Sequence, residues 1–205
     1  MSYGLSGASG TGKSTLAKAL AEKMHIHYLD ASTTRLMAEF SFNPVGDGHS
    51  LDERITAQEY LLGAFVRMLR HAPRPFVCDR TPIDMAAYML GEITMRNSTL
   101  AQGERVRKYV GDCMEALFHN FDAVLTVRPL GTYEAASTRP PRNPAYQWKI
   151  QYLIDGLIAN IDEQDYTSIG AIIVKPLDER IEAASLFFGA QMKELMELRD
   201  AVGAH

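Results

Sequence analysis

The chain has 205 residues, of which 46% are hydrophobic and 22% charged, and its formal net charge at pH 7 is -4. This composition excludes a disordered or fibrous protein, and the length fits a single domain, residues 1–205. The acidic balance also excludes a global basic field that could hold a long stretch of nucleic acid.

Alternation of short apolar runs with amphipathic stretches predicts the elements in chain order. In the first part we expect a strand at 3–6, a helix at 13–24, a strand at 25–29, a loop at 41–50 and a helix at 52–69. The second part adds a strand at 76–78, helices at 82–95 and 98–119, a strand at 123–127, a loop at 130–145, a helix at 145–161, a strand at 171–174 and a helix at 180–201. Strands that alternate with helices predict an α/β fold with a parallel sheet covered on both faces.

Cysteine usage and hydropathy indicate the cellular compartment in which we expect the protein. Cys78 and Cys113 stand outside any CxxC or Cys/His cluster, so we expect neither a zinc site nor a disulfide framework. No window reaches about 18 consecutive apolar residues, and no secretory leader is apparent. We therefore expect a cytoplasmic protein of a bacterium or of a phage-infected host, without a membrane partner.

The segment from Gly7 to Ser14 matches the phosphate-binding pattern G-x-x-x-x-G-K-[ST]. An apolar strand is expected before it and an amphipathic helix after it, as the pattern requires. The main-chain N–H groups of such a loop point at a phosphate, and the helix N-terminus adds its positive dipole. We expect the loop to bind ATP and Mg²⁺ through Gly7, Ser9, Gly10, Thr11, Gly12, Lys13, Ser14 and Thr15.

Two residues of this loop have separate expected roles. Lys13 supplies a positive charge to the outer phosphates, and the Ser14 hydroxyl ligates Mg²⁺. ATP is favoured over GTP because the chain has no Asn-Lys-x-Asp segment after a later strand. A motor ATPase is disfavoured because no expected strand ends in a tandem Asp-Glu pair.

Asp79 and Arg80 directly follow the apolar run at 76–78, at the edge of an α/β sheet where ligands bind. A carboxylate at this position can accept a proton from an attacking hydroxyl, or partner Mg²⁺ directly or through water. Arg80 can neutralise the charge of a phosphoryl group in transfer. The alternative is a surface turn in which Asp79 caps the next helix.

Together, Gly7 to Ser14 and Asp79-Arg80 resemble the P-loop nucleoside and nucleotide kinases, among which thymidylate kinases and deoxyribonucleoside kinases carry an acidic-Arg pair after the third strand. The resemblance implies a five-stranded sheet of order 2-3-1-4-5, a lid after the fourth strand, and Asp79 as base or metal partner. The stretch from Asp79 to Tyr88 also resembles small AAA-type kinases of bacteriophages. One such group phosphorylates a hydroxymethylated uracil within DNA, which keeps a modified base in DNA as an alternative acceptor.

Arginines and prolines are concentrated between the fourth expected strand and the helix at 145–161. Arg139 and Arg142 flank Pro140 and Pro141, which predicts a mobile lid over about 130–145 that brings both arginines to the transferring phosphoryl group. A solvated surface loop is the alternative. Arg128 is a candidate for the base of the lid.

The acceptor pocket is expected between the second strand and the helix at 52–69. Asp30 follows that strand and can hold an acceptor hydroxyl, or cap the next segment. Arg54 and Gln58 lie in the same region, and Gln58 can read the edge of a base. Tyr88 is a further candidate for acceptor contact, with a core position as its alternative.

The predicted function is ATP-dependent transfer of the γ-phosphoryl group to a hydroxyl or phosphate of a nucleoside- or nucleotide-type acceptor. One alternative is a kinase of a hydroxymethylated base within DNA, and another is a nucleotide-binding regulatory ATPase without an acceptor. A homodimer is an alternative to a monomer. Two basic clusters can contact a nucleic acid or form solvated faces: Arg67, Arg70, His71 and Arg74, and Arg105, Arg107 and Lys108.

Overall fold

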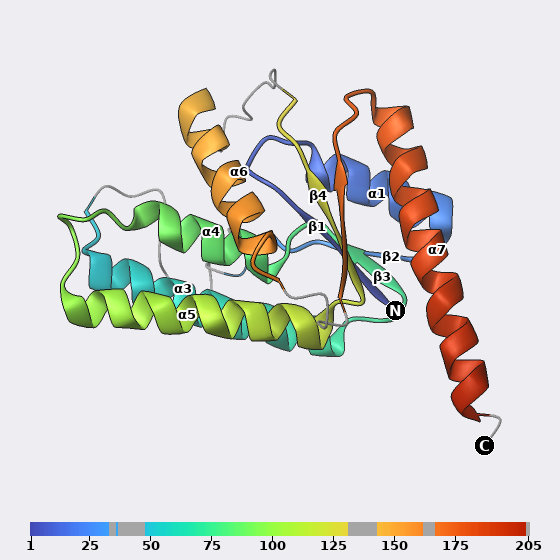
Figure 1. Cartoon of the computed structure of the whole chain (residues 1–205), viewed down its shortest axis with the longest axis horizontal. Helices are drawn as coiled ribbons and strands as arrows, with labels where there is room; N and C mark the ends of the chain where they lie inside the picture. Colours follow the sequence, from blue (N-terminus) through green and yellow to red (C-terminus); the bar gives the residue numbers. More distant parts are fainter. Residues whose placement is uncertain (33–35, 37–47, 131–142, 162–166, 204–205) are drawn as a thin grey trace.

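Five parallel strands form the centre of the structure, a computed structural model that describes residues 1–32, 36, 48–130, 143–161 and 167–203 (Figure 1). The strands are β1 (Ser2–Ser6), β2 (His27–Leu29), β3 (Phe76–Cys78), β4 (Ala123–Val127) and β5 (Ser168–Ile172). Their order in the sheet is β2-β3-β1-β4-β5, which confirms the expected order 2-3-1-4-5.

The three central strands consist of buried residues throughout, as continuous apolar runs in parallel sheets predict. In β4, Ala123, Leu125 and Val127 face one core and Val124 faces the other, because successive side chains of a strand alternate between faces. Gly4 of β1 pairs with Cys78 of β3, so the carboxyl ends of these two neighbours lie at the same edge of the sheet.

Helices cover both faces of the sheet (Figure 1). On one face, α1 (Lys13–Met24) packs against α7 (Leu177–Gly203). The other face carries α3 (Leu51–His71), α4 (Pro82–Glu92), α5 (Leu100–Asn120) and α6 (Pro144–Ile158), with α4 in contact with the other three. Within the described part of the chain, no helix is long and apolar enough to cross a membrane. Cys78 and Cys113 are free, buried thiols.

The boundaries of several elements differ from those expected. The last strand is Ser168–Ile172 and not 171–174, because this edge strand is only partly buried and its apolar pattern is a poor guide. Ile173, expected inside the strand, is 74% exposed. Helix α5 begins after Thr99, whose side chain accepts a hydrogen bond from the Gln102 N–H, and not at Ser98. Helix α7 begins at Leu177, so Arg180 lies in its first turn.

Candidate functional site

The segment from Gly7 to Ser14 connects the end of β1 to the start of α1, and its glycines dictate its path. Gly10 and Gly12 have φ angles of 78° and 82°, in the left-handed region that glycine adopts without strain. At Gly7, with φ of 154°, an added Cβ would lie 2.5 Å from the carbonyl oxygen of Val127. Gly10 and Gly12 therefore need glycine for their φ angles, and Gly7 needs it because a Cβ would clash with Val127.

Lys13 is the first residue of α1, and its side chain folds back over the start of the loop. Its Nζ donates to the carbonyl oxygens of Gly7 and Ala8, the latter at 3.0 Å. The ammonium charge therefore lies beside the loop, where the expected role in binding outer phosphates requires it. Thr15, the last of the expected loop residues, is exposed.

The loop and the Asp-Arg pair meet through Ser14 and Asp79. Asp79 is 9% exposed, and its Oδ2 accepts hydrogen bonds from the Ser14 hydroxyl at 2.5 Å and the Tyr28 hydroxyl at 2.9 Å. Its Oδ1 accepts from the Ala31 N–H at 3.1 Å. Burial, followed by the charge of Asp79, raises the pKa of Tyr28 well above its usual value, so this hydroxyl stays protonated.

The oxygens of Ser14 and Asp79 suit Mg²⁺, which prefers oxygen ligands and keeps several of its waters. Among the described residues, no group of three or more His, Cys, Asp and Glu side chains could hold a metal. The donor set therefore fits a magnesium ion shared with phosphate oxygens and does not fit an all-protein metal cage.

Asp84, which the sequence reasoning missed, fixes the start of the loop from α4. It is 1% exposed, and its Oδ1 accepts from the Ser6 hydroxyl and from the Gly7 N–H, both at 2.8 Å. Its Oδ2 accepts from the Thr81 N–H at 3.1 Å. The spacing of Thr81 and Asp84 could have indicated a helix cap. No local sequence pattern indicates the contact of Asp84 with Gly7, because the two residues are far apart in the sequence.

Three side chains from α4 and α6 contact the outer part of the loop. The Tyr88 hydroxyl accepts from the Ser9 N–H at 2.9 Å, and the Gln151 Oε1 accepts from the Ala8 N–H at 3.3 Å. Gln147 donates to the Ser9 carbonyl oxygen at 2.6 Å. Tyr88 was expected near the acceptor, and the structure places its hydroxyl on the loop; Gln147 and Gln151 were not expected.

A second polar group lies at the end of β4 and joins α6 to α7. Arg128, the candidate lid base, forms an ion pair with Asp155, which also accepts from Gln151 at 3.1 Å. Arg180 donates to the carbonyl oxygen of Arg128 at 3.2 Å and to that of Thr11 at 2.9 Å. Side chains of α6 thus contact Ala8 and Ser9 of the loop, and Arg180 of α7 contacts Thr11. Arg139 and Arg142 lie outside the described residues, as does most of the expected lid.

The candidates for the acceptor side lie on different elements. Arg54 of α3 approaches Glu92 of α4, with 3.8 Å between Nη1 and Oε2. Gln58, one turn further along α3, accepts from the Tyr109 hydroxyl at 3.2 Å. Asp30 follows β2, and its Oδ1 accepts from the Ser32 N–H at 3.0 Å, a local turn contact.

Arg80 is partly exposed beside the loop and α5. Burial raises the pKa of the Tyr88 and Tyr109 hydroxyls, and the nearby charge of Arg80 opposes this rise at both positions. Its charge is therefore felt both at Tyr88, which contacts the loop, and at Tyr109 of α5.

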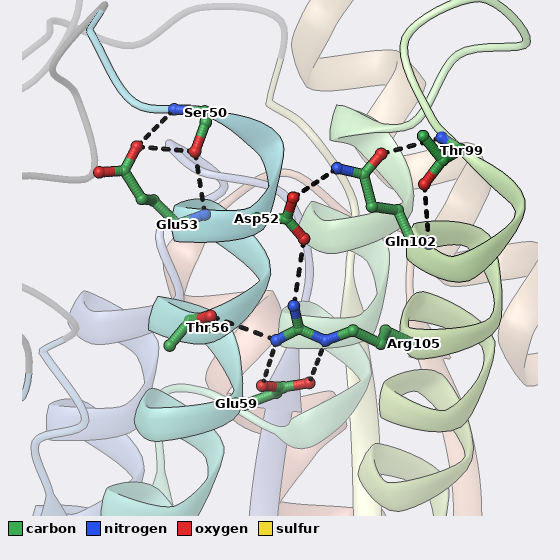
Figure 2. Close-up of polar contacts among 8 residues, drawn as sticks. All are labelled: Ser50, Asp52, Glu53, Thr56, Glu59, Thr99, Gln102 and Arg105. Atoms are coloured by element: carbon green, nitrogen blue, oxygen red, sulfur yellow. Dashed lines mark hydrogen bonds and ion pairs between the residues drawn. The ribbon is translucent and has the colours of Figure 1, made fainter.

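The two basic clusters do not line the loop. Figure 2 shows Arg105 of α5 between carboxylates of α3, with hydrogen bonds to Glu59 at 2.7 Å and Asp52 at 3.2 Å. Arg107 and Lys108 pair with Glu104 and Asp112 on their own helix. The other cluster precedes β3 and lies at the amino edge of the sheet, where Arg74 donates to the Ser2 hydroxyl at 3.0 Å.

The sheet order, the glycine-shaped loop and the carboxylate at the end of β3 define the fold of the P-loop nucleoside and nucleotide kinases, as the resemblance of the motifs predicted. Residues 3–165 match the model of the AAA domain family, and the chain belongs to that family. No curated protein matches the chain.

Several solved structures share this fold at low sequence identity. Deoxyadenosine kinase from M. mycoides with bound dCTP superposes with a TM-score of 0.67 and 14% identity, covering 93% of this chain and 100% of the kinase chain. The same kinase with bound dATP has a TM-score of 0.64 and 14% identity, with coverage of 92% and 100%. NadR in complex with NAD and AMP-PNP has a TM-score of 0.56 and 15% identity, with coverage of 92% of this chain and 49% of NadR.

Proposed function

We propose that this protein transfers the γ-phosphoryl group of ATP to a hydroxyl or phosphate of a small nucleoside- or nucleotide-type acceptor. The observation that carries the proposal is the hydrogen bond between Ser14 and Asp79 at the carboxyl edge of the sheet. It places a carboxylate beside the residue that ends a phosphate-binding pattern, which is the combination that phosphoryl transfer requires.

The loop residues hold the nucleotide. The N–H groups of Gly7, Ala8 and Ser9 already donate to side chains, so the phosphates fall to the main-chain N–H groups of the loop after Ser9. The Lys13 ammonium offsets the charge of the β- and γ-phosphates. Ser14 and Asp79 would hold Mg²⁺, which neutralises phosphate charge when bound. Arg80 stabilises the charge that develops on the transferred group.

For Asp79 we favour the role of metal partner over that of general base. Its two oxygens already accept hydrogen bonds from the Ser14 hydroxyl, the Tyr28 hydroxyl and the Ala31 N–H. These hydrogen bonds fix its orientation next to the Ser14 hydroxyl. A general base needs an oxygen free to accept the proton of the attacking hydroxyl.

A small acceptor is favoured over a base within DNA. The cluster around Arg105 is paired with carboxylates, and the cluster around Arg74 lies at the edge of the sheet opposite to Asp79. Neither provides an electrostatic groove beside the reacting phosphate. The similar structures carry nucleotides of ordinary size, dCTP and dATP in the deoxyadenosine kinase.

The test is a transfer assay with γ-labelled ATP, Mg²⁺ and a panel of nucleosides, deoxynucleosides, mononucleotides and DNA containing hydroxymethyluracil. We expect label in a small acceptor, loss of transfer in Lys13→Ala, and unchanged transfer in the control Lys193→Ala, an exposed lysine of α7. Label in the DNA alone would overturn the proposed acceptor class. Release of labelled phosphate with no labelled acceptor would support a regulatory ATPase instead.

A further inference from the structure

Arg180, in the first turn of α7, is a buried cation whose hydrogen-bond partners among the described residues are main-chain carbonyl oxygens. Its side chain is 2% exposed, and its two terminal nitrogens donate to main-chain carbonyl oxygens, at 2.9 Å to Thr11 and 3.2 Å to Arg128. Within the described residues, its Nε has no hydrogen-bond partner. Carbonyl oxygens satisfy donors, but they do not neutralise a full positive charge.

No charged side chain in the described part of the chain compensates for the charge of Arg180. The carboxylate of Asp155 is engaged by Arg128 and Gln151. Burial lowers the pKa of Arg180, and no carboxylate among the described residues contributes an opposing effect. A buried charge without a partner of opposite sign is strongly unfavourable. The described residues supply no such partner to Arg180, and the phosphates of a bound nucleotide would supply one.

The guanidinium lies directly against the phosphate loop. A Cβ added at Gly12 would lie 3.1 Å from its Nη1, so a larger residue there would push Arg180 away. The Thr11–Gly12 peptide is trans, and in a trans peptide the C=O and the following N–H point in opposite directions. By holding the Thr11 carbonyl oxygen, Arg180 turns the Gly12 N–H toward the other side of the loop.

We propose that Arg180 is a positioning residue of the nucleotide site, which orients the Thr11–Gly12 peptide and adds a fixed positive charge behind the phosphate loop. Arg180 should therefore raise the affinity more for ATP than for AMP, because ATP carries more phosphate charge. The inference rests on the proposed binding of ATP. Arg180 lies beyond residues 3–165, the part of the chain that matches the family model.

The test measures the affinities of ATP and AMP by calorimetry for the full chain and for Arg180→Gln and Arg180→Lys. Gln keeps a donor and loses the charge, whereas Lys keeps the charge and cannot span both carbonyl oxygens. We expect Arg180→Gln to weaken ATP about tenfold with little change for AMP, the size of one charge interaction in a partly buried site. Arg180→Lys should retain most of the preference for ATP over AMP.

Other outcomes would overturn the inference. A residue that only supports the fold would lower both affinities equally, leaving the ratio of ATP to AMP affinity unchanged in Arg180→Gln. If Arg180→Gln does not fold, Arg180→Lys provides the test. Loss of its preference for ATP over AMP would contradict the role of the charge. The matched control is Arg107→Gln, which replaces an exposed arginine that pairs with Glu104 on α5. Absence of ATP binding by the unaltered protein would overturn the proposed function as well, whereas equal binding by Arg180→Gln overturns this inference alone.

Discussion

The carboxylate of Asp84, in the first turn of α4, accepts a hydrogen bond at 2.8 Å from the main-chain N–H of Gly7, the residue at which β1 passes into the phosphate loop. The same oxygen accepts from the Ser6 hydroxyl, so one buried side chain fixes both the end of the strand and the start of the loop. Helix α4 thus determines where the loop begins.

Removal of this carboxylate should destabilise the protein. Asp84→Ala leaves the Ser6 hydroxyl and the N–H groups of Gly7 and Thr81 buried without an acceptor, so the free energy of unfolding should fall by about 3 kcal/mol. Urea unfolding measures the change. The exposed Asp112, paired with Lys108, is the control, and Asp112→Ala should change stability by less than about 0.5 kcal/mol. Equal stability of the two variants would contradict the assigned role of Asp84.

Asp79→Asn separates the two roles considered for this residue. As a metal partner, Asp79 lowers the Mg²⁺ concentration needed for half-maximal transfer, and its amide variant should need roughly tenfold more. Excess Mg²⁺ should then restore much of the rate. Titration of Mg²⁺ in the transfer assay measures both quantities. A rate that stays low at saturating Mg²⁺ with an unchanged midpoint would instead assign Asp79 as the base.

Stability should decline in alkaline solution because of buried acids that remain protonated in the native state. Burial raises the pKa of Cys113 from 9.0 to about 12. Below pH 9 the thiol is neutral in both states and contributes nothing. Above pH 9 the unfolded thiol loses its proton and the native thiol keeps it, so the native state binds more protons and the free energy of unfolding falls as pH rises.

Urea unfolding between pH 7 and pH 10.5 checks this expectation. Tyr3 and Tyr146 add to the decline above pH 10, because burial raises the pKa of each from 10.0 to about 12. Cys113→Ala should make the decline less steep from pH 9 upward, and part of the decline should remain because burial also raises the pKa of Cys78. A free energy of unfolding that is constant over this range would show that these groups titrate alike in both states.

The Arg105 network joins α3 and α5 near the first turns of both helices, at their ends away from the sheet (Figures 1 and 2). It is exposed, so Arg105→Ala should lower the free energy of unfolding by only about 0.5–1 kcal/mol. Phosphoryl transfer should be unchanged. Fluorescence anisotropy of a labelled DNA duplex should show equally weak binding with both proteins, since the positive charge is already matched. A large loss of DNA binding in the variant would restore this face as a nucleic-acid surface.

Local patterns were sufficient for the sheet order and for the position of the glycine-rich loop. The glycine spacing from Gly7 to Gly12 encodes the bend of the loop, and apolar runs at the centre of the sheet mark buried strands. Edge strand β5 was misplaced because a half-exposed strand lacks a continuous apolar run. Contacts of Asp84, Gln151 and Arg180 with the loop were not predictable, because each joins residues that only the tertiary fold brings together.

The anchoring of the loop has a consequence for any attempt to move or shorten it. Its main chain is held by side chains that lie much later in the sequence, on α4, α6 and finally α7. A fragment that ends before α7 would keep the whole segment from Gly7 to Ser14. It would lack Arg180, which holds the Thr11 carbonyl oxygen. If the eight residues from Gly7 to Ser14 are transplanted into another sheet, we expect the segment to bind phosphate only weakly.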